Sequence, residues 1–480
     1  MLVLVFIIGF LLLRSVAGRS SMLERLGFAL PVGLAAVTLV MLLMDWAGIA
    51  LTRTSLTVLT LTLLAAATAI NGRSLCPAKI KPLNLKSQIS NLKPSFGWFN
   101  LVWLLLLVGV VYLEYVNLAK CLTYPTYDRD SMAAFDTFGY VCAREGTYLR
   151  MSLFEPDYIP SLQHAGSAMN YMPMVQLSYA YVYVFGAATS KAVPAFIYLG
   201  FLFGLYGLCR RRLTHTASML VLMGVMLTPE MTSFASHSMT NVMHACIASA
   251  AIIYLCLWLE RRKKHDLRLC ALLLAVNVWM RAEGIVFVGV ALLLIAIAAI
   301  RSRKFSCLLP PALALLPLVV WTVCSNVCGL STGSALIMHP FWDGEKMQTV
   351  LSGIWGLLGG GEFYGWTFNF ALIMLHVHIF YIIYGSVTKS QIYKVAKSQI
   401  TLSRYLLWAI MIGLAGYALV LYHVDYLWDS VQNVLAFSAK RFLFCFVPMA
   451  WYFSLSIVPM RMLAAWFERT CGIEGKKSKE

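Results

Sequence analysis

Residues 241–259 read NVMHACIASAAIIYLCLWL, a run that contains no Asp, Glu, Lys or Arg. About 20 consecutive apolar residues cross the ~30 Å hydrocarbon core of a bilayer as one helix. Backbone polar groups inside hydrocarbon must be paired within the protein, and a helix pairs all of its own. Because similar runs recur along the chain, this stretch predicts an all-α polytopic membrane protein.

The composition of the whole chain agrees with this prediction. Of its 480 residues, 60% are hydrophobic and 12% are charged, and a soluble domain with that balance would expose too much apolar surface. The net charge of +17 comes from short clusters between apolar runs, which is typical of membrane topology rather than of nucleic-acid binding. The first run, Leu2 to Leu13, is interpreted as a retained helix and not as a signal peptide.

Charge counting predicts the number of spans. If the short segment Met172 to Gly186 lies at the membrane interface, one side of the membrane carries 28 of the 38 Lys and Arg residues and 6 of the 21 acidic residues. If that segment crossed instead, Arg210, Arg211 and Arg212 would lie on the wrong side. The positive-inside rule therefore favours about 13 transmembrane helices, an outward N-terminus and a cytoplasmic C-terminus. The predicted spans lie near 1–13, 26–46, 55–71, 97–118, 193–209, 216–229, 241–259, 268–280, 284–300, 306–325, 364–384, 405–423 and 442–460.

The chain is predicted to have three parts. Residues 1–96 form an appended N-terminal transmembrane module with a basic cytoplasmic linker, residues 97–460 a transmembrane core, and residues 461–480 a basic cytoplasmic tail. An acidic loop at 124–171 and a Gly-rich loop at 326–363 are both expected to face outward.

The acidic loop is the part of the chain that membrane crossing does not explain. Its YDRD motif places Asp128 and Asp130 two residues apart, directly after a Pro-containing turn. One carboxylate there could accept a proton from an acceptor hydroxyl, and the second could orient that group or hold a divalent ion. The alternative is that both aspartates cap the helix-like run that follows. Asp136 lies inside that run and is a weaker candidate.

Two further features flank the acidic loop. The segment Met172 to Gly186 is short and rich in Tyr, and we expect an interfacial helix with its rings at headgroup level.

The twelve Cys residues are scattered without metal-ligand spacing, so most are expected to be small core side chains. Cys121 and Cys142 could pair if the loop faces an oxidising compartment.

Three cationic spots are expected to face outward near the membrane and are candidates for binding a phosphate. They are Arg281 in WMRAEG, the pair Lys440 and Arg441 in SAKRFLF, and Arg144 with Arg150 in the acidic loop. An Arg side chain offers a forked pair of donors to a phosphate, whereas an Arg at a membrane edge commonly extends its head toward water. Arg281 also has a simpler explanation, an ion pair with Glu283 at the tip of a hairpin.

The histidines are weaker signals. His237 and His244 lie seven residues apart, so both can face one side of a helix, but two histidines alone are weak evidence for a metal. His376 and His378 are expected to pack or to hydrogen-bond between helices. Walker, GxSxG, HExxH and dinucleotide-binding motifs are absent from the sequence.

The order of several segments resembles the GT-C class of membrane glycosyltransferases, which includes the protein-mannosyltransferase and aminoarabinose-transferase families. The resemblance covers about 97–460, by the order and character of segments rather than by identity. The segments are DSMAAF at 130–135, NYMPMVQLSYAYVYVFG at 170–186, FLFGLYGLCRRR at 201–212, SHSMTN at 236–241, RAEG at 281–284 and SAKRF at 438–442.

This resemblance implies GT-C-like architecture and an activity. The enzyme would transfer a sugar from a polyprenyl-phosphate donor to an extracytoplasmic lipid, glycan or protein acceptor, with inversion, in what is expected to be a bacterial inner membrane. Asp130 would be the catalytic base, assisted by Asp128. Arg441, helped by Lys440 and Arg281, would bind the donor phosphate, with Asn241 and Tyr171 as further substrate-binding residues.

The chain departs from the family's pattern at two positions. Phe135 stands where the family has Trp, and Asn241 stands where an acidic residue is common. The second departure weakens any two-carboxylate metal site, so we expect no dedicated metal site, and a divalent cation remains an open alternative.

Two other functions share this topology. A transporter or flippase of a lipid-linked sugar would show paired repeats, broken helices and intramembrane charge. No repeat stands out and nearly all charges lie at span ends, which favours the enzyme. An oligosaccharide ligase or polymerase is the third alternative, and only a substrate assay separates it from single-sugar transfer.

Overall fold

The computed structural model describes residues 1–18, 20–75, 98–154, 171–330, 341–388, 391–428 and 430–470. All regular secondary structure in these ranges is helical. Nine of the described helices are long and apolar enough to cross a membrane, or ten if a bent pair counts as one span. The chain is therefore an all-α polytopic membrane protein, as its hydropathy predicts.

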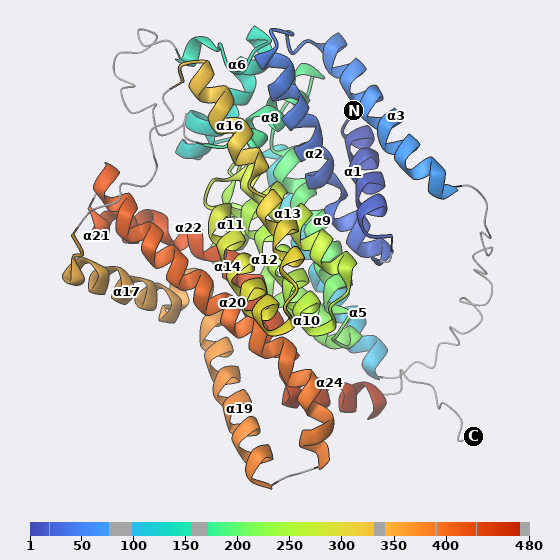
Figure 1. The fold of residues 1–480 in the computed structure, drawn as a ribbon, viewed down its shortest axis with the longest axis vertical. Coiled ribbons are helices and arrows are strands. Elements are labelled where there is room, and N and C mark those ends of the chain that lie inside the picture. The colour runs from blue at the N-terminus through green and yellow to red at the C-terminus, as the bar shows by residue number, and fades with distance from the viewer. Residues whose placement is uncertain are drawn as a thin grey trace.

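Figure 1 shows how the described helices are arranged. In chain order they are α1 (Leu2–Val16), α2 (Met22–Trp46), α3 (Arg53–Leu75), α5 (Trp98–Thr123), η1 (Ser131–Asp136), α6 (Thr137–Glu145), η2 (Ser152–Phe154), α8 (Met174–Val184), α9 (Ala192–Cys209), α10 (His215–Met226), α11 (Pro229–Phe234), α12 (Asn241–Arg261), α13 (Lys264–Met280), α14 (Gly284–Ser302), η4 (Phe305–Leu308), α15 (Leu309–Leu313), α16 (Leu316–Val327), α17 (Gly344–Gly359), α18 (Gly361–Tyr364), α19 (Thr367–Thr388), α20 (Gln391–Trp428), α21 (Val431–Val434), η5 (Leu435–Ala439), α22 (Lys440–Phe442), η6 (Leu443–Cys445), α23 (Phe446–Ser456) and α24 (Val458–Thr470).

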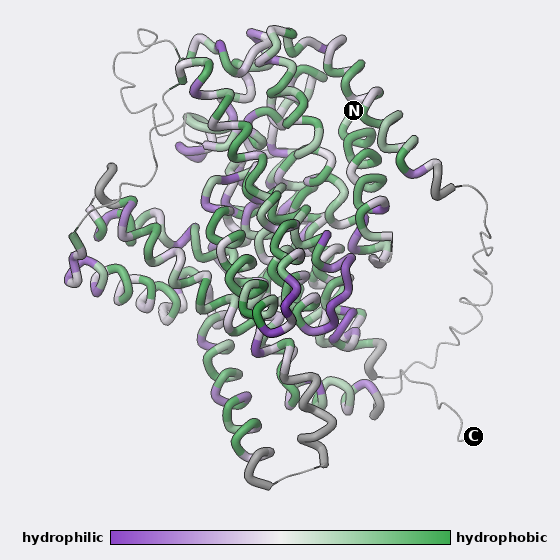
Figure 2. The backbone as a smooth tube through the Cα atoms, viewed as in Figure 1, coloured by the Kyte–Doolittle hydropathy of each residue, from purple (hydrophilic) through white to green (hydrophobic). Residues whose placement is uncertain are grey.

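Helix α12 occupies the centre of the bundle. Its residues from Asn241 to Leu259 are all buried, and it packs against α9, α13, α14, α20 and α23. A helix that is apolar on every side has no preference for one face, so it is stable where neighbours surround it. Hydrophobic residues extend along most of the surrounding helices, and hydrophilic residues gather mainly near helix ends (Figure 2).

Glycines let the first helices approach one another closely. A Cβ atom on Gly9 of α1 would lie 1.8 Å from the carbonyl oxygen of Ala29 in α2, and one on Gly27 of α2 would lie 2.4 Å from the Cα of Gly204 in α9. Small residues at such contacts allow backbones to pack without intervening side chains. Helix α2 is thus packed into the core formed by residues after 97, and the predicted boundary at residue 96 lies outside the described residues.

Two predicted segments differ from the observed structure. The run predicted at 306–325 is broken, because Pro310, Pro311 and Pro317 interrupt helical hydrogen bonding, and its two parts meet at 42°. The loop predicted at 326–363 contains the sixteen-residue helix α17. Asp343 begins it by accepting a hydrogen bond from the Lys346 amide at 3.0 Å.

The surroundings of helix α8 also differ from the prediction. The prediction placed the aromatic rings of this segment among lipid headgroups, but Tyr179 and Tyr181 are fully buried. Helix α8 packs against α2 and α6, so protein and not lipid surrounds these rings. Its eleven residues are too few to cross a bilayer, which agrees with the prediction that it does not span.

Ion pairs bring three linkers together at one end of the bundle, which we call the basic end. Arg211, between α9 and α10, donates to both Glu24 at the start of α2 and Asp266 at the start of α13. Tyr254 of α12 donates a further hydrogen bond to Glu24 at 2.6 Å. Both carboxylates are only 1% exposed. This contact places the linkers at 14–25, 210–215 and 260–268 on the same side, as the charge count requires.

The opposite end is organised by the acidic loop folding back onto the bundle. The Asp45 carboxylate, at the end of α2, accepts hydrogen bonds from the Thr147 hydroxyl at 2.6 Å and from the Tyr148 amide at 2.8 Å. The buried Lys191 ammonium donates to the Tyr124 carbonyl at 2.8 Å and so fixes the turn that leads into the YDRD motif. These contacts tie both ends of the described loop to the helices.

Candidate functional site

Asp130 and Arg441 form an ion pair at the end of the bundle opposite the basic end, although 311 positions separate them in sequence. The Arg441 guanidinium donates to Asp130 Oδ2 and makes a longer contact of 3.5 Å with the Ser438 hydroxyl. The side chain of Asp130 is 44% exposed and that of Arg441 is 21% exposed. The two residues that sequence analysis ranked first therefore meet at an open surface.

Each partner stands next to a π-helical turn. Asp130 directly precedes η1, and Arg441 follows η5 by two residues. A π-helical turn widens the helix by one residue per turn, which redirects the side chains on either side of it, and such turns occur often at functional sites. Both charges therefore lie beside irregular helical backbone.

Lys440 points to a different partner. Its ammonium donates to Glu230 Oε1 at 2.7 Å and lies 4.6 Å from the centre of the Phe363 ring. Its backbone carbonyl accepts from the Tyr364 hydroxyl at 2.6 Å. Lys440 is therefore held beside α11 and α18, adjacent to Arg441 in sequence but engaged with its own carboxylate.

Arg281 is buried, with 7% of its surface exposed. It donates to the Asn241 side chain, to Thr240 Oγ1 at 3.1 Å and to Glu283 Oε1 at 2.8 Å. Burial works against the charge of Arg281, but the Glu283 carboxylate outweighs it and raises the pKa of the guanidinium. The ion pair with Glu283, which the sequence left as an alternative, is present. Arg281 therefore joins Glu283 to Thr240 and Asn241 and is not a free cation.

Two aromatic side chains join the Arg281 cluster to the Asp130–Arg441 pair. The Phe442 ring lies 5.2 Å from the Arg281 guanidinium and follows Arg441 directly. The pKa of Tyr171 is raised by burial, and the charges that act on its phenol are those of Arg281, Glu283, Asp130 and Arg441. Tyr171 also packs on Phe135, with ring centres 4.9 Å apart. The predicted residues Asp130, Arg441, Arg281, Asn241 and Tyr171 thus gather in one region.

Asp128 has a structural contact of its own. Its carboxylate accepts the Ser131 amide hydrogen bond at 3.0 Å, so it caps the helical turn that begins after it. Nearby, His237 Nε2 lies 2.9 Å from the Tyr127 hydroxyl. Burial lowers the pKa of His237, against the opposing effect of Asp128. The capping alternative therefore describes Asp128, while any assisting role for it stays a prediction.

Several other predictions fall outside this region. Cys121 and Cys142 are both buried free thiols, so the disulfide that an oxidising compartment would permit is absent from the described residues. His378 contacts Ser403 of the neighbouring helix at 3.2 Å, as expected of an interhelical histidine. No group of three potential metal ligands gathers within the described ranges. The acidic loop also contains Glu155 and Asp157, which lie outside the described residues.

Sequence reasoning missed Glu230 and Thr240. Glu230 sits in the first turn of α11, after Thr228 and Pro229, in a sequence that reads as an ordinary helix start. Glu230 matters because it forms an ion pair with Lys440, which is 210 positions away in the sequence. The only local signal is an acidic residue that opens a short polar segment between apolar runs.

A scan against protein-family models, a search of curated proteins and a search of solved structures found no match for this chain. The function is therefore argued from the geometry of the site.

Proposed function

We propose that this chain is an inverting membrane glycosyltransferase of GT-C type that uses a polyprenyl-phosphate sugar as donor. The observation that carries the proposal is the meeting of Asp130 and Arg441 at one partly exposed rim. A carboxylate and a guanidinium at the same place supply the two groups that this reaction needs. The carboxylate accepts the acceptor proton, and the cation stabilises charge on the departing phosphate.

The reaction balances with these two groups alone. Asp130 takes the proton from an acceptor hydroxyl as its oxygen bonds to the anomeric carbon. The bond from that carbon to the phosphate oxygen breaks, and the polyprenyl phosphate leaves with the electron pair. Attack from the face opposite the phosphate inverts the anomeric configuration. Arg441 stabilises the charge that grows on the leaving phosphate through its forked donors.

The observed ion pair also suggests how the donor prepares the base. In the unliganded protein the Arg441 guanidinium donates a hydrogen bond to one carboxylate oxygen of Asp130. A phosphate that binds Arg441 competes with this carboxylate, since both are anionic acceptors for the same donors. Donor binding would therefore release Asp130 to the acceptor hydroxyl, so that the base becomes free only when the donor is present.

The finer topology belongs to the same proposal. We place the chain in a bacterial inner membrane with about 13 spans, the basic end in the cytoplasm and the Asp130 rim facing the periplasm or exterior. Helices α1, α10 and α13 are too short to count as spans by length alone. Added to the nine long described helices and the bent pair, they would bring the number of spans to about 13. The donor's prenyl chain would remain in the outer leaflet while its phosphate reaches Arg441.

Incubation of the purified protein with a panel of radiolabelled polyprenyl-phosphate sugars tests the proposal. Mixed acceptors of lipid, glycan and protein type are supplied, and release of free polyprenyl phosphate is the readout. The proposal expects release from one donor class, accompanied by a labelled acceptor. Absence of release from every donor, together with movement of a labelled lipid-linked sugar across proteoliposomes, would identify a transporter. Release of a lipid diphosphate from a preassembled oligosaccharide donor would identify a ligase.

A further inference from the structure

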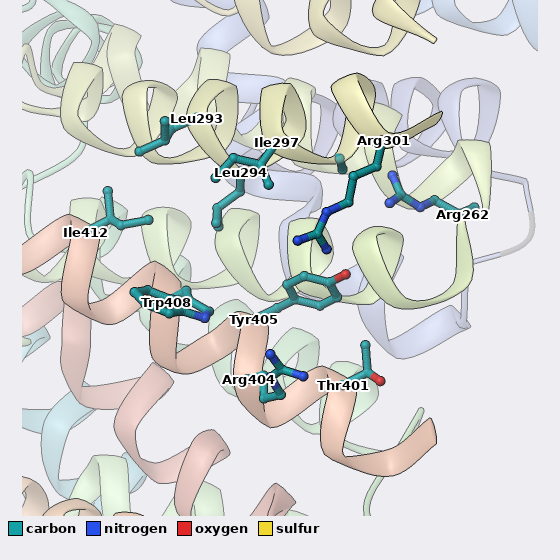
Figure 3. A pocket seen from close by; sticks show the side chains of 11 residues that line it. Arg262, Leu293, Leu294, Ile297, Arg301, Thr401, Arg404, Tyr405, Trp408 and Ile412 are labelled. Carbon is teal, nitrogen blue, oxygen red and sulfur yellow. The ribbon is translucent and has the colours of Figure 1, made fainter. Parts of the chain in front are cut away.

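A groove lies between α14 and α20 near the basic end of the bundle (Figure 3). The two helices pack against each other, and the groove has a volume of about 590 Å³. This value lies within the range of roughly 300–1,000 Å³ that is usual for pockets holding small organic ligands. The groove belongs to neither the Asp130 rim nor the buried Arg211 cluster.

The lining of the groove on α14 changes from charged to apolar along the helix. Arg301 stands near the end of α14, and Ile297 and Leu293 precede it by four and eight residues. Residues four apart lie on the same face of a helix, each step rising about 6 Å. This face of α14 therefore presents one cation followed by about 12 Å of hydrocarbon.

Helix α20 repeats this order. Arg404 lines the groove, and Trp408 and Ile412 follow it by four and eight residues. The two faces thus match in chemistry and spacing, with both arginines at one end and both apolar rows leading away from it. Arg262, which follows α12, adds a third cation at that end, as Figure 3 shows.

The three arginines carry charge that the described residues do not neutralise. Arg262 lies over the Trp258 ring at 4.6 Å, but none of the three forms an ion pair with a carboxylate in the described ranges. The neighbouring Arg211 and Arg212, by contrast, both pair with carboxylates. In the view of Figure 3, the side chains of Arg301 and Arg404 lie on opposite sides of Tyr405. Three such cations around one mouth attract an anion.

The apolar rows decide what kind of anion fits. Leu293 is 47% exposed, Ile297 45% and Trp408 56%. A small soluble anion would neutralise the arginines and leave these side chains uncovered. A phospholipid would cover them with an acyl chain while its phosphate reaches the guanidinium groups, which is how basic pockets between transmembrane helices bind anionic lipids.

We infer that the groove between α14 and α20 binds an anionic phospholipid from the leaflet at the basic end, with its phosphate held by Arg262, Arg301 and Arg404. The acyl chain lies along Leu293, Ile297 and Trp408. This site is at the opposite end of the bundle from Asp130, and its existence does not depend on the proposed sugar transfer. Occupation would bridge α14 to α20 and hold these two helices together.

Fluorescence quenching by brominated lipids tests this inference, because Trp408 lies in the groove. The full-length protein is reconstituted in phosphatidylcholine vesicles that contain increasing fractions of brominated phosphatidylglycerol or of brominated phosphatidylcholine. The signal of Trp408 is the difference between the wild type and Trp408→Phe. Half-quenching is expected at an anionic-lipid fraction about tenfold lower than the zwitterionic one. Equal quenching by both lipids would overturn the inference.

A matched pair of variants separates the groove from general surface charge. The triple variant Arg262→Gln, Arg301→Gln, Arg404→Gln should lose the preference for the anionic lipid. The control Lys263→Gln, Lys264→Gln, Arg268→Gln removes the same number of charges from the same end, outside the groove, and should keep it. An equal loss in both would show that the groove is not the site. Soluble glycerol phosphate should leave the quenching unchanged, and displacement by it would assign the arginines to a soluble phosphate instead.

Discussion

The two ends of the helical bundle each hold an arginine paired with carboxylate, but the pairs differ in exposure and in the number of partners. At the basic end, Arg211 lies between Glu24 and Asp266, both 1% exposed, and Tyr254 adds a donor. At the opposite end, Arg441 has one carboxylate partner, Asp130, whose side chain is 44% exposed.

The difference separates a structural role from a chemical one. Buried charges are tolerated only when partners satisfy them, so removing one member of such a cluster is costly. A partly exposed ion pair adds little to the free energy of unfolding, because water screens its charges. Each partner nevertheless remains accessible to a substrate. The Arg211 cluster is thus expected to hold the fold, and the Asp130–Arg441 pair to act on a ligand.

The largest stability effect is expected from Arg211→Ala. This change leaves two buried carboxylates without their cation, which costs about 3–5 kcal/mol. Thermal unfolding in detergent measures the loss. The exposed Arg268→Ala on α13 serves as the control and should change the free energy of unfolding by no more than about 0.5 kcal/mol. Equal stability of the two variants would remove the distinction between the ends.

The next effect is expected from Arg441→Gln. Loss of the charged fork should weaken donor binding by about 1.5–3 kcal/mol, or roughly 10- to 100-fold in the donor KM. The free energy of unfolding should change by less than about 1 kcal/mol, because the ion pair is partly exposed. A large loss of stability with unchanged KM would show that Arg441 belongs to the fold.

A smaller effect is expected from Glu230→Gln. The Lys440–Glu230 pair is intermediate between the two ends, with exposures of 21% and 18%. Neutralising Glu230 should lower the free energy of unfolding by about 0.2–1 kcal/mol. A shift of several kcal/mol in the same unfolding assay would instead place Lys440 with the buried Arg211 cluster.

The smallest effect concerns pH. Burial lowers the pKa of His237 below its ordinary 6.5, so below that pH the unfolded chain binds a proton that the folded chain excludes. Stability should therefore fall as pH decreases from about 6.5 toward the depressed folded pKa. His237→Gln keeps an acceptor for Tyr127 and removes this contribution. Unfolding measured between pH 8 and 5 should show a shallower decline for the variant, and identical slopes would contradict the assignment.

Much of the fold could be predicted because hydropathy is a local signal. The run at 241–259 corresponds closely to α12, which ends at Arg261. Helix α17 could not be predicted from hydropathy, because glycines dilute the signal in its segment. Its evidence lies in the capping Asp343 and in the spacing of Val350, Ile354 and Leu357, which are its buried apolar side chains.

The candidate site was predictable only in part, because its contacts join distant segments. Asp130 and Arg441 were expected to belong to one site, as base and phosphate-binding cation, but their direct ion pair across 311 positions is a property of the packed bundle. Arg281 was ranked as a cation for phosphate, and its hydrogen bonds to Thr240 and Asn241 could not be read from the sequence. Partners of this kind depend on helix packing, which a single sequence does not specify.

The most direct test of the central claim is the single-turnover rate of polyprenyl phosphate release by Asp130→Asn. The account predicts a rate about 10²- to 10⁴-fold below that of the wild type, because the general base is lost. Asp136→Asn is the matched control in the same loop, where the side chain accepts a hydrogen bond from Tyr183 at 2.6 Å, and it should retain the wild-type rate. An Asp130→Asn protein that releases lipid phosphate as fast as Asp136→Asn would contradict the account.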